Sequence, residues 1–272
     1  MKPKKALKAA YSGALATMIF SGLVQAHDPV FGLGPHVLFK GGYEVAPELY
    51  TAKKGDKRES ELGVELTYGL SGDWAAGIEV PYVNQSVGNS SDSGQGDVRL
   101  FSKYRFWRQD GPGLQQSLSL VVKLKTDTAE SHLGTGTTDG IVGLSYGYEG
   151  RKWYRWAAAR YVINDTNDAG LQRGNKLLLD LVGGIRPTQN SYREPDTVWI
   201  IELNGELDQH AEFNNINLAN SGGDEWFVSP GIFWTQRNFA IKAGVQIPII
   251  SQLNGNQTKS DYRAKLVLEW HL

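Results

Sequence analysis

The chain has 272 residues, with 28 Lys or Arg and 29 Asp or Glu, so its formal net charge at pH 7 is −1. This balance argues against a nucleic-acid-binding surface as the main function. The absence of cysteine excludes disulfides, thiolate zinc sites and cysteine nucleophiles. A mean hydropathy of −0.36 argues against a helical membrane protein.

Residues 1–26 have the pattern of a secretory signal peptide. The cationic start, MKPKKALK, precedes an apolar stretch from Ala14 to Phe20, and Val24-Gln-Ala26 places compact residues where a signal peptidase reads them. We predict cleavage after Ala26, so the exported chain begins at His27. An N-terminal membrane anchor is the alternative, although the apolar core is short and interrupted by Ser, Thr and Gly. Beyond it, no apolar run approaches the ~18 residues of a transmembrane helix.

The rest of the sequence alternates apolar and polar residues with a period of two. From Leu62 to Leu70 every second residue is apolar, whereas Glu61 and Glu65 fall on the other face, a separation that a strand produces and a helix does not. The register at 153–163 stays open, because four large residues are adjacent there. Blocks of this kind predict about twelve strands, near 36–50, 60–70, 74–83, 96–107, 114–125, 138–149, 153–163, 175–186, 197–208, 225–234, 239–250 and 260–272.

The predicted connections and the tryptophans both distinguish two ends of the molecule. Connections after even-numbered strands are mostly short, and those after odd-numbered strands are mostly longer and polar, as in outer-membrane barrels with tight periplasmic turns and long outer loops. The indole ring favours a membrane interface, so tryptophans gathered at one end indicate an aromatic girdle. The tryptophans predicted near strand ends on the short-turn side are Trp74, Trp107, Trp153, Trp156, Trp199, Trp234 and Trp270.

The C-terminal residues complete the fold prediction. Residues 262–272 form an amphipathic strand that resembles the signal read by the barrel assembly machinery, except that it ends in Leu272 where Phe or Trp is usual. We therefore predict an all-β, up-and-down antiparallel transmembrane β-barrel of about 12 strands at 36–272, preceded by a periplasmic segment at 27–35. A secreted β-sandwich or jelly roll would also explain the alternation and the signal peptide, but not the tryptophan placement.

If the apolar face meets lipid, the polar face lines a lumen. Twelve strands give a lumen between that of packed eight-stranded barrels and that of open porins, so we expect a narrow, water-containing, charge-lined pore. The charges are either structural ion pairs or a basic wall at 99–125 beside an acidic wall at 61–79, which would orient solutes. The expected pore-lining residues are Glu61, Glu65, Glu79, Asp97, Arg99, Lys103, Arg105, Lys123, Lys125, Asp180, Arg186, Glu202, Glu206, Lys242, Arg263 and Lys265.

Three stretches resemble a known family. They are GQGDVRLFSKYRF at 94–106, GTGTTDGIVGL at 134–144, and VSPGIF at 228–233 with AGVQIP at 243–248. Together they resemble, over about 36–272, the outer-membrane proteins named for the meta-pathway of phenol degradation. The resemblance implies an outer-membrane barrel that admits hydrophobic or aromatic compounds. The resulting hypothesis is an outer-membrane channel for passive passage of small solutes; the alternative is a non-conducting barrel with a binding, metal-related or scaffold role in the cell envelope.

We predict no enzymatic activity and no cofactor. Outer-membrane phospholipase chemistry needs Ser and His within reach on the lipid-facing side, but Ser131-His132 falls in a predicted outer loop. The glycine-rich stretch 134–140 lacks the lysine of a phosphate-binding loop. The expected partners are outer-membrane lipid and lipopolysaccharide, the barrel assembly machinery during biogenesis and a small-molecule solute, with no nucleic acid.

The segment before the first predicted strand leaves three interpretations open. His27 as a new N-terminus could chelate Cu(II), with Asp28 and His36 nearby. The same residues could form an ordinary periplasmic tail. Because the segment is rich in Gly and Pro, it could also fold into the barrel mouth as a plug.

Overall fold

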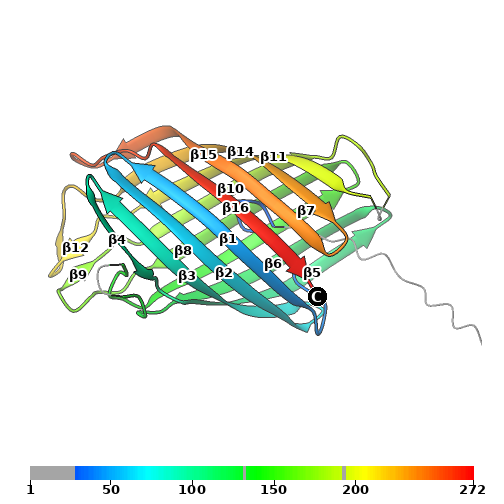
Figure 1. Ribbon diagram of the computed structural model, residues 1–272, viewed down its shortest axis with the longest axis horizontal. Coiled ribbons are helices and arrows are strands. Elements are labelled where there is room, and N and C mark those ends of the chain that lie inside the picture. Colours follow the sequence, from blue (N-terminus) through cyan, green and yellow to red (C-terminus); the bar gives the residue numbers. More distant parts are fainter. Residues whose placement is uncertain (1–27, 131–132, 192–193) are drawn as a thin grey trace, which may run out of the picture.

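The computed structural model describes residues 28–130, 133–191 and 194–272, and these residues form an antiparallel β-barrel (Figure 1). Twelve strands make the barrel wall: β1 (Tyr43–Lys54), β2 (Lys57–Ser71), β3 (Trp74–Val87), β5 (Arg99–Gly111), β6 (Leu114–Lys125), β7 (Asp139–Gly150), β8 (Trp153–Ile163), β10 (Lys176–Ile185), β11 (Asp196–Asp208), β14 (Gly223–Gln236), β15 (Phe239–Leu253) and β16 (Tyr262–His271). No helix in the described ranges is long and apolar enough to cross a membrane.

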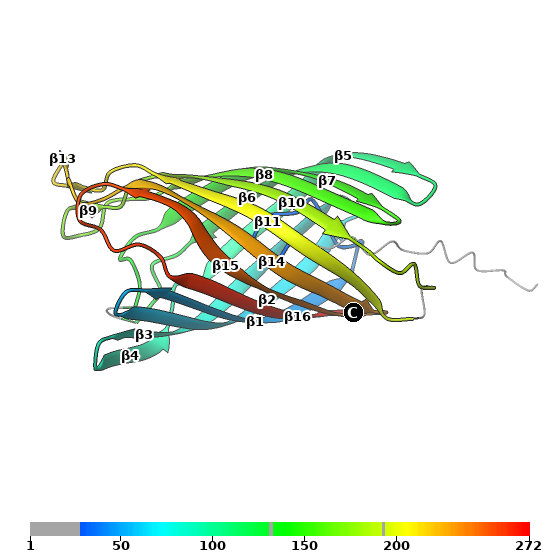
Figure 2. The ribbon, with the colours of Figure 1, turned by 90° about the horizontal axis from the view of Figure 1, so that it is seen from above.

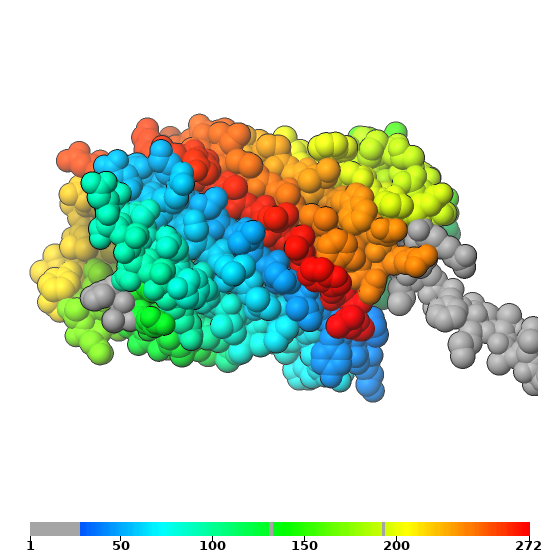
Figure 3. Space-filling view, viewed as in Figure 1, coloured from blue at the N-terminus to red at the C-terminus, as the bar shows by residue number. Residues whose placement is uncertain are grey.

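The wall closes between the first and last strands. β1 pairs with β2 on one side and with β16 on the other, where Val45 lies opposite Trp270 and Thr51 opposite Ala264. Figure 3 shows this closure as the red β16 running between the blue β1 and the orange β15. Every wall strand therefore has a neighbour on both edges, which is the arrangement that satisfies the backbone hydrogen bonds of a sheet within lipid.

The remaining short strands extend the wall at the end that carries the long loops. β4 (Ser90–Gln95) pairs with the outer part of β3 and prolongs the sheet. β9 (Leu171–Gln172), β12 (Glu212–Phe213) and β13 (Ile216–Asn217) form a separate three-stranded sheet between two loops. Figure 2 shows these additions at one end and the short turns with the C-terminus at the other.

The predicted strands are confirmed in number and order, but the first one begins in the wrong place. We expected a strand at 36–50, whereas β1 begins at Tyr43 and continues to Lys54. Val37 and Leu38 are buried inside the barrel, only 5% and 4% exposed, rather than in its wall. An apolar pair that packs against the lumen has the same pattern as one that faces lipid, so the sequence alone did not separate them.

The two faces of the wall differ as the alternation predicted. Outward residues of the strands are apolar and exposed, for example Leu62, Val122 and Leu144, and they form the lipid-facing band. Trp74, Trp153, Trp199 and Trp270 are exposed near the short-turn end, which fits the predicted girdle. Trp156 is an exception: it is 5% exposed and points into the lumen, where its Nε1 donates to Glu149 Oε1 at 3.3 Å. The adjacent large residues of β8 therefore alternate, with Trp153 and Arg155 outside.

Candidate functional site: the lumen and its N-terminal plug

Residues 28–38, here called the lumen plug, lie inside the barrel rather than outside it. Lys103 Nζ on β5 donates to Asp28 Oδ2 at 2.5 Å, and Ser119 Oγ on β6 donates to the Pro35 carbonyl at 2.8 Å. Leu33 packs in a buried cluster with Val121 and Ala158 of the wall. These contacts attach the plug to the part of the wall formed by β5, β6 and β8 (Figure 2, dark blue).

Glu202 on β11 is the main anchor of the plug. Its Oε1 accepts the backbone N–H of Val30 at 2.7 Å, and its Oε2 accepts that of Gly32 at 2.8 Å. The Phe31 N–H lies at 3.2 Å from Oε1 as well. Glu202 is only 1% exposed. Successive N–H groups that point at one buried carboxylate form an anion-binding turn, which compensates the cost of burying this charge.

Glycines in the wall make room for the plug. A side chain at Gly147 on β7 would place its Cβ 2.7 Å from Pro35 Cγ, and one at Gly244 on β15 would place it 3.0 Å from the Phe31 ring. Neither glycine has a positive φ, so the backbone conformation does not itself require glycine at these positions. The wall and the plug therefore fit each other, because larger residues at these two positions would collide with the segment.

An apolar cluster fills part of the lumen at the short-turn end. Its members are inward-facing residues of β8, β10, β11, β14 and β15, namely Tyr154, Trp156, Val182, Val198, Ile200, Phe233 and Ala240. Tyr154 and Trp156 stack with ring centroids 5.5 Å apart. We call this set the dry core, since its side chains meet one another instead of water.

Three cavities that share lining residues lie in the lumen. The outer cavity, about 230 Å³, is lined by residues near the loop end such as Lys57, Lys176 and Asp208. The middle cavity, about 290 Å³, shares Tyr50, Glu206 and Arg263 with the outer one. The inner cavity, about 350 Å³, shares Glu48, Arg99, Arg160 and Lys265 with the middle one, and it extends beside the plug to Glu44 and His271 near the short turns. The series therefore leads from the loop end of the barrel to the plug and along it.

Ion pairs between strands surround the cavities. Arg99 Nη1 lies 2.7 Å from Glu61 Oε1 and 2.5 Å from Glu79 Oε1, so the predicted basic and acidic walls meet at this residue. Lys265 pairs with Glu48 at 2.8 Å and Arg160 with Asp180 at 2.7 Å. Arg263 forms a bidentate pair with Glu206, with its Nη2 at 3.0 Å from Oε2. Such pairs reduce the cost of burying charge and hold the strands in register.

Lys123 and Glu65 are different, because neither forms an ion pair within the described residues. Both line the inner cavity. Lys123 Nζ lies 5.2 Å from the centroid of the Phe101 ring, close enough for a cation–π contact. A charged ammonium and a carboxylate in a cavity that also exposes aromatic and apolar groups can bind a solute that is partly polar and partly apolar.

The other expected pore-lining residues lie at the two ends. Arg105 pairs with Asp73 of a short turn at 2.8 Å, and Arg186 pairs with Asp196 at 2.6 Å. Lys242 pairs with Glu269 beside the plug. Arg105 and Arg186 therefore lie at the short-turn end, away from the cavities of the outer half. Lys242 also lies toward this end, but it borders the inner cavity.

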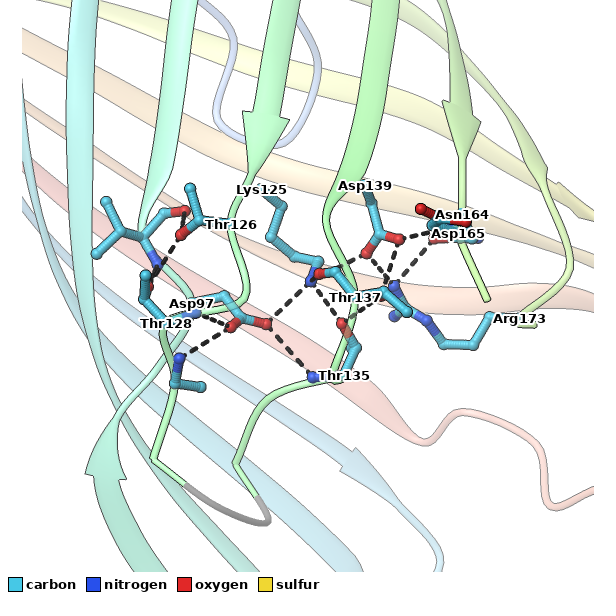
Figure 4. Close-up of polar contacts among 12 residues, drawn as sticks. Asp97, Lys125, Thr126, Thr128, Thr135, Thr137, Asp139, Asn164, Asp165 and Arg173 are labelled. Carbon is cyan, nitrogen blue, oxygen red and sulfur yellow. Dashed lines mark hydrogen bonds and ion pairs between the residues drawn. The ribbon is translucent and has the colours of Figure 1, made fainter. Parts of the chain in front are cut away.

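Asp97 and Lys125 organise the loop end, as Figure 4 shows. Lys125 Nζ lies 3.0 Å from both Asp97 Oδ2 and Asp139 Oδ2, and Arg173 also pairs with Asp139. Asp97 Oδ1 accepts the N–H groups of Thr128 and Ala129. Burial acts to raise the pKa of Asp97, but the hydrogen bonds from Lys125 and from backbone N–H groups outweigh it and hold this pKa below its usual value.

The copper site proposed at His27 and His36 stays a prediction. His27 lies outside the described residues, and His36 lines the inner cavity as part of the plug. Within the described chain, Glu44, Glu269 and His271 place one ligand atom each within 4.8 Å of one another. Lys242, however, already pairs with Glu269, so an ammonium supplies the positive charge that a metal ion would bring. Ser131 and His132, considered for hydrolysis, are outside the described residues.

The sequence prediction left out several residues that border the cavities, among them Glu48, Arg160 and Phe101. Glu48 lies within the predicted strand at 36–50 but was not singled out, and Arg160 was left out because the register at 153–163 was open. Phe101 was missed because it lies on the charged face of β5, where a single aromatic residue gives no signal.

Comparison with solved structures identifies the fold. The crystal structure of the COG4313 outer membrane channel from Pseudomonas putida F1 superposes with a TM-score of 0.69 at 13% identity, and the match covers 91% of this chain and 100% of that one. The structure of the NanC porin matches less well, with a TM-score of 0.49 at 10% identity over 85% of this chain and all of that one. The match to the COG4313 channel shows that the two chains share the fold of a closed antiparallel β-barrel.

Sequence comparison then places it in a family. The family model described as "Putative MetA-pathway of phenol degradation" matches residues 27–194, and the chain belongs to this family. No curated protein matches the sequence. The family resemblance seen in the sequence motifs is therefore confirmed.

Proposed function

We propose that this barrel is a passive, narrow outer-membrane channel for small solutes. The observation that carries the proposal is the series of three cavities, which lead from the loop end to the plug and share their lining residues. A continuous hydrated path with charged walls is what a pore needs, because ions and polar solutes exchange water for wall contacts along it. The expected pore-lining residues that border this path are Glu61, Glu65, Glu79, Arg99, Lys103, Lys123, Asp180, Glu206, Lys242, Arg263 and Lys265.

We infer that the solutes are small and amphipathic, including aromatic compounds. The inner cavity combines Lys123 and Glu65 with the rings of Phe31 and Phe101, and its volume of about 350 Å³ suits a small molecule. The description of the family also connects it with phenol degradation. An aromatic body would contact the phenylalanine rings, while a carboxylate or hydroxyl group would reach the lysine.

A non-conducting barrel with a binding role in the envelope is the second candidate. The lumen plug and the dry core favour it, since both lie toward the short-turn end and narrow the lumen there.

Recording from single molecules in a planar bilayer separates the two candidates. Purified mature protein, shown to be folded by heat-modifiable gel migration, should give discrete conductance steps. Silence from a verified folded sample would refute the channel and support the binding role. Two further measurements on cells that express the full chain test separate parts of the proposal: intact mass tests the removal of residues 1–26, and membrane fractionation tests the outer-membrane location.

A further inference from the structure

A hollow of about 480 Å³ opens on the outside of the barrel, away from the lumen. It spans β8, β10 and β11 near their short-turn ends. Its outward residues are Trp153 and Arg155 on β8, Gly183 and Ile185 on β10, and Trp199 and Ile201 on β11. This concave site interrupts the apolar band that outward side chains form on a lipid-facing wall.

Gly183 creates the hollow. It faces outward between Arg155 and Ile201, which are its direct partners on the two neighbouring strands. A Cβ at Gly183 would meet no atom within 4 Å, so the missing side chain leaves open space. The partners on either side stand roughly 10 Å apart across two strand spacings, and Gly183 forms the floor between them.

The two tryptophans form the rim. Trp153 and Trp199 both lie opposite Ile185, one on each side, and they are 52% and 56% exposed. Two indole rings around an apolar floor at a membrane interface suit the glycerol and upper acyl region of a lipid.

Arg155 gives the hollow a charge. It is the one cation among the outward residues of β8, where the others are Trp153, Ala157, Ala159, Tyr161 and Ile163. Its guanidinium lies 5.4 Å from the centroid of the Tyr148 ring and forms no ion pair with a carboxylate in the described ranges. Lys152, in the adjoining turn, places its Nζ 5.9 Å from the centroid of the Trp153 ring. Two cations beside an apolar groove are complementary to a ligand that carries a negative charge and an apolar body.

We propose that this hollow binds an anionic phospholipid of the inner leaflet, with its phosphate on Arg155 and an acyl chain over Gly183. The short turns of such barrels face the periplasm, so the lipid at this end is phospholipid rather than lipopolysaccharide. Arg155 is tolerated on the lipid face because it lies only two residues from the girdle, where charge costs about 0–1 kcal/mol. The proposal is independent of whether the lumen conducts.

Native mass spectrometry of the purified mature protein, titrated with phosphatidylglycerol or with diacylglycerol of the same chains, tests the proposal. Gly183→Leu fills the floor and should weaken phosphatidylglycerol binding about tenfold, whereas Ala159→Leu, which adds similar bulk on the outward face of β8 but outside the hollow, should not. Arg155→Gln should reduce the preference for phosphatidylglycerol over diacylglycerol about tenfold, the size of one charged hydrogen bond. Arg108→Gln, which removes an exposed cation from another short-turn hairpin, is its control.

Heat-modifiable migration must show that each variant is folded, and Gly183→Val serves if the leucine variant is not. Equal lipid binding by wild type and the Gly183 variant would overturn the proposal. A dimer that Gly183→Leu abolishes would also overturn it, because a second copy of the chain would then occupy the hollow.

Discussion

The outer and inner halves of the lumen use opposite ways to fill the same barrel. In the outer half, ion pairs such as Arg263–Glu206 and Lys176–Asp208 line cavities and leave space between them. In the inner half, the dry core and the lumen plug occupy the space with packed apolar groups and backbone. One wall can therefore combine a hydrated path with a packed region, because the inward residues of β8, β10 and β11 change from charged to apolar toward the short-turn end.

The largest effect should come from the dry core. Phe233→Ala leaves a cavity among Val198, Ile200 and Trp156, and we expect a loss of about 3–5 kcal/mol in the free energy of unfolding. Leu144→Ala on the lipid face is the control, because detergent or lipid replaces the lost contacts there. Urea unfolding of both variants in the same micelles measures the difference. Equal losses would mean that the inner half is not a packed core.

A smaller effect should follow from weakening the plug. Glu202→Ala removes the acceptor of the Val30 and Gly32 amides, at a cost of about 1–3 kcal/mol. The exchange of these amides with solvent should therefore accelerate at least about tenfold, as hydrogen-exchange mass spectrometry or NMR would show. Glu225→Gln near the loop end should leave the same amides unchanged. Unaltered exchange in the Glu202 variant would contradict the anchoring role.

The inner cavity offers a test of the hydrated half. Lys123→Gln removes a cation that has no ion-pair partner in the described chain, so the permeability ratio of the proposed channel should shift toward cations, by about twofold. Lys259→Gln, in an exposed loop outside the cavities, should not alter the ratio. Reversal potentials in asymmetric salt provide the measurement. An unchanged ratio in the Lys123 variant would remove this residue from the path.

The smallest effect should be a pH dependence at the loop end. The folded pKa of Asp97 lies below its usual value, so its contribution to holding Thr128, Ala129 and Thr135 is present above about pH 4 and is lost as pH falls through the lower folded pKa. Exchange of the Thr128 amide, corrected for the intrinsic rate, should rise only in that acidic range. Asp97→Asn should raise it at neutral pH as well. A rise centred near pH 7 would point to another group.

Much of the wall could be predicted from sequence because every strand buries one face and exposes the other. The prediction at 114–125 coincides with β6 and the one at 153–163 with β8. The regular alternation disappears where residues pack inside the lumen, so Trp156 was assigned to the girdle and Val37 to a strand.

The lumen contacts were less predictable than the wall. The sequence indicated that Arg99, Glu61 and Glu79 would share a lumen, but their contact depends on the pairing of β3 with β5 across the excursion of β4. The glycine- and proline-rich segment before β1 suggested a plug as one of three interpretations. Its position depends on Glu202, which is about 170 residues away in sequence, and no local pattern reports such a contact.

The central claim is that solutes move through the charged outer half and that the dry core is not part of the path. Because the natural chain has no cysteine, single cysteines report on this directly. Leu178→Cys lies at the middle cavity and Ala240→Cys in the dry core. We predict that a charged methanethiosulfonate reagent reduces single-channel conductance in the Leu178 variant and leaves the Ala240 variant unchanged. Current that is insensitive to modification at Leu178, in a protein shown by mass to be labelled, would contradict the account.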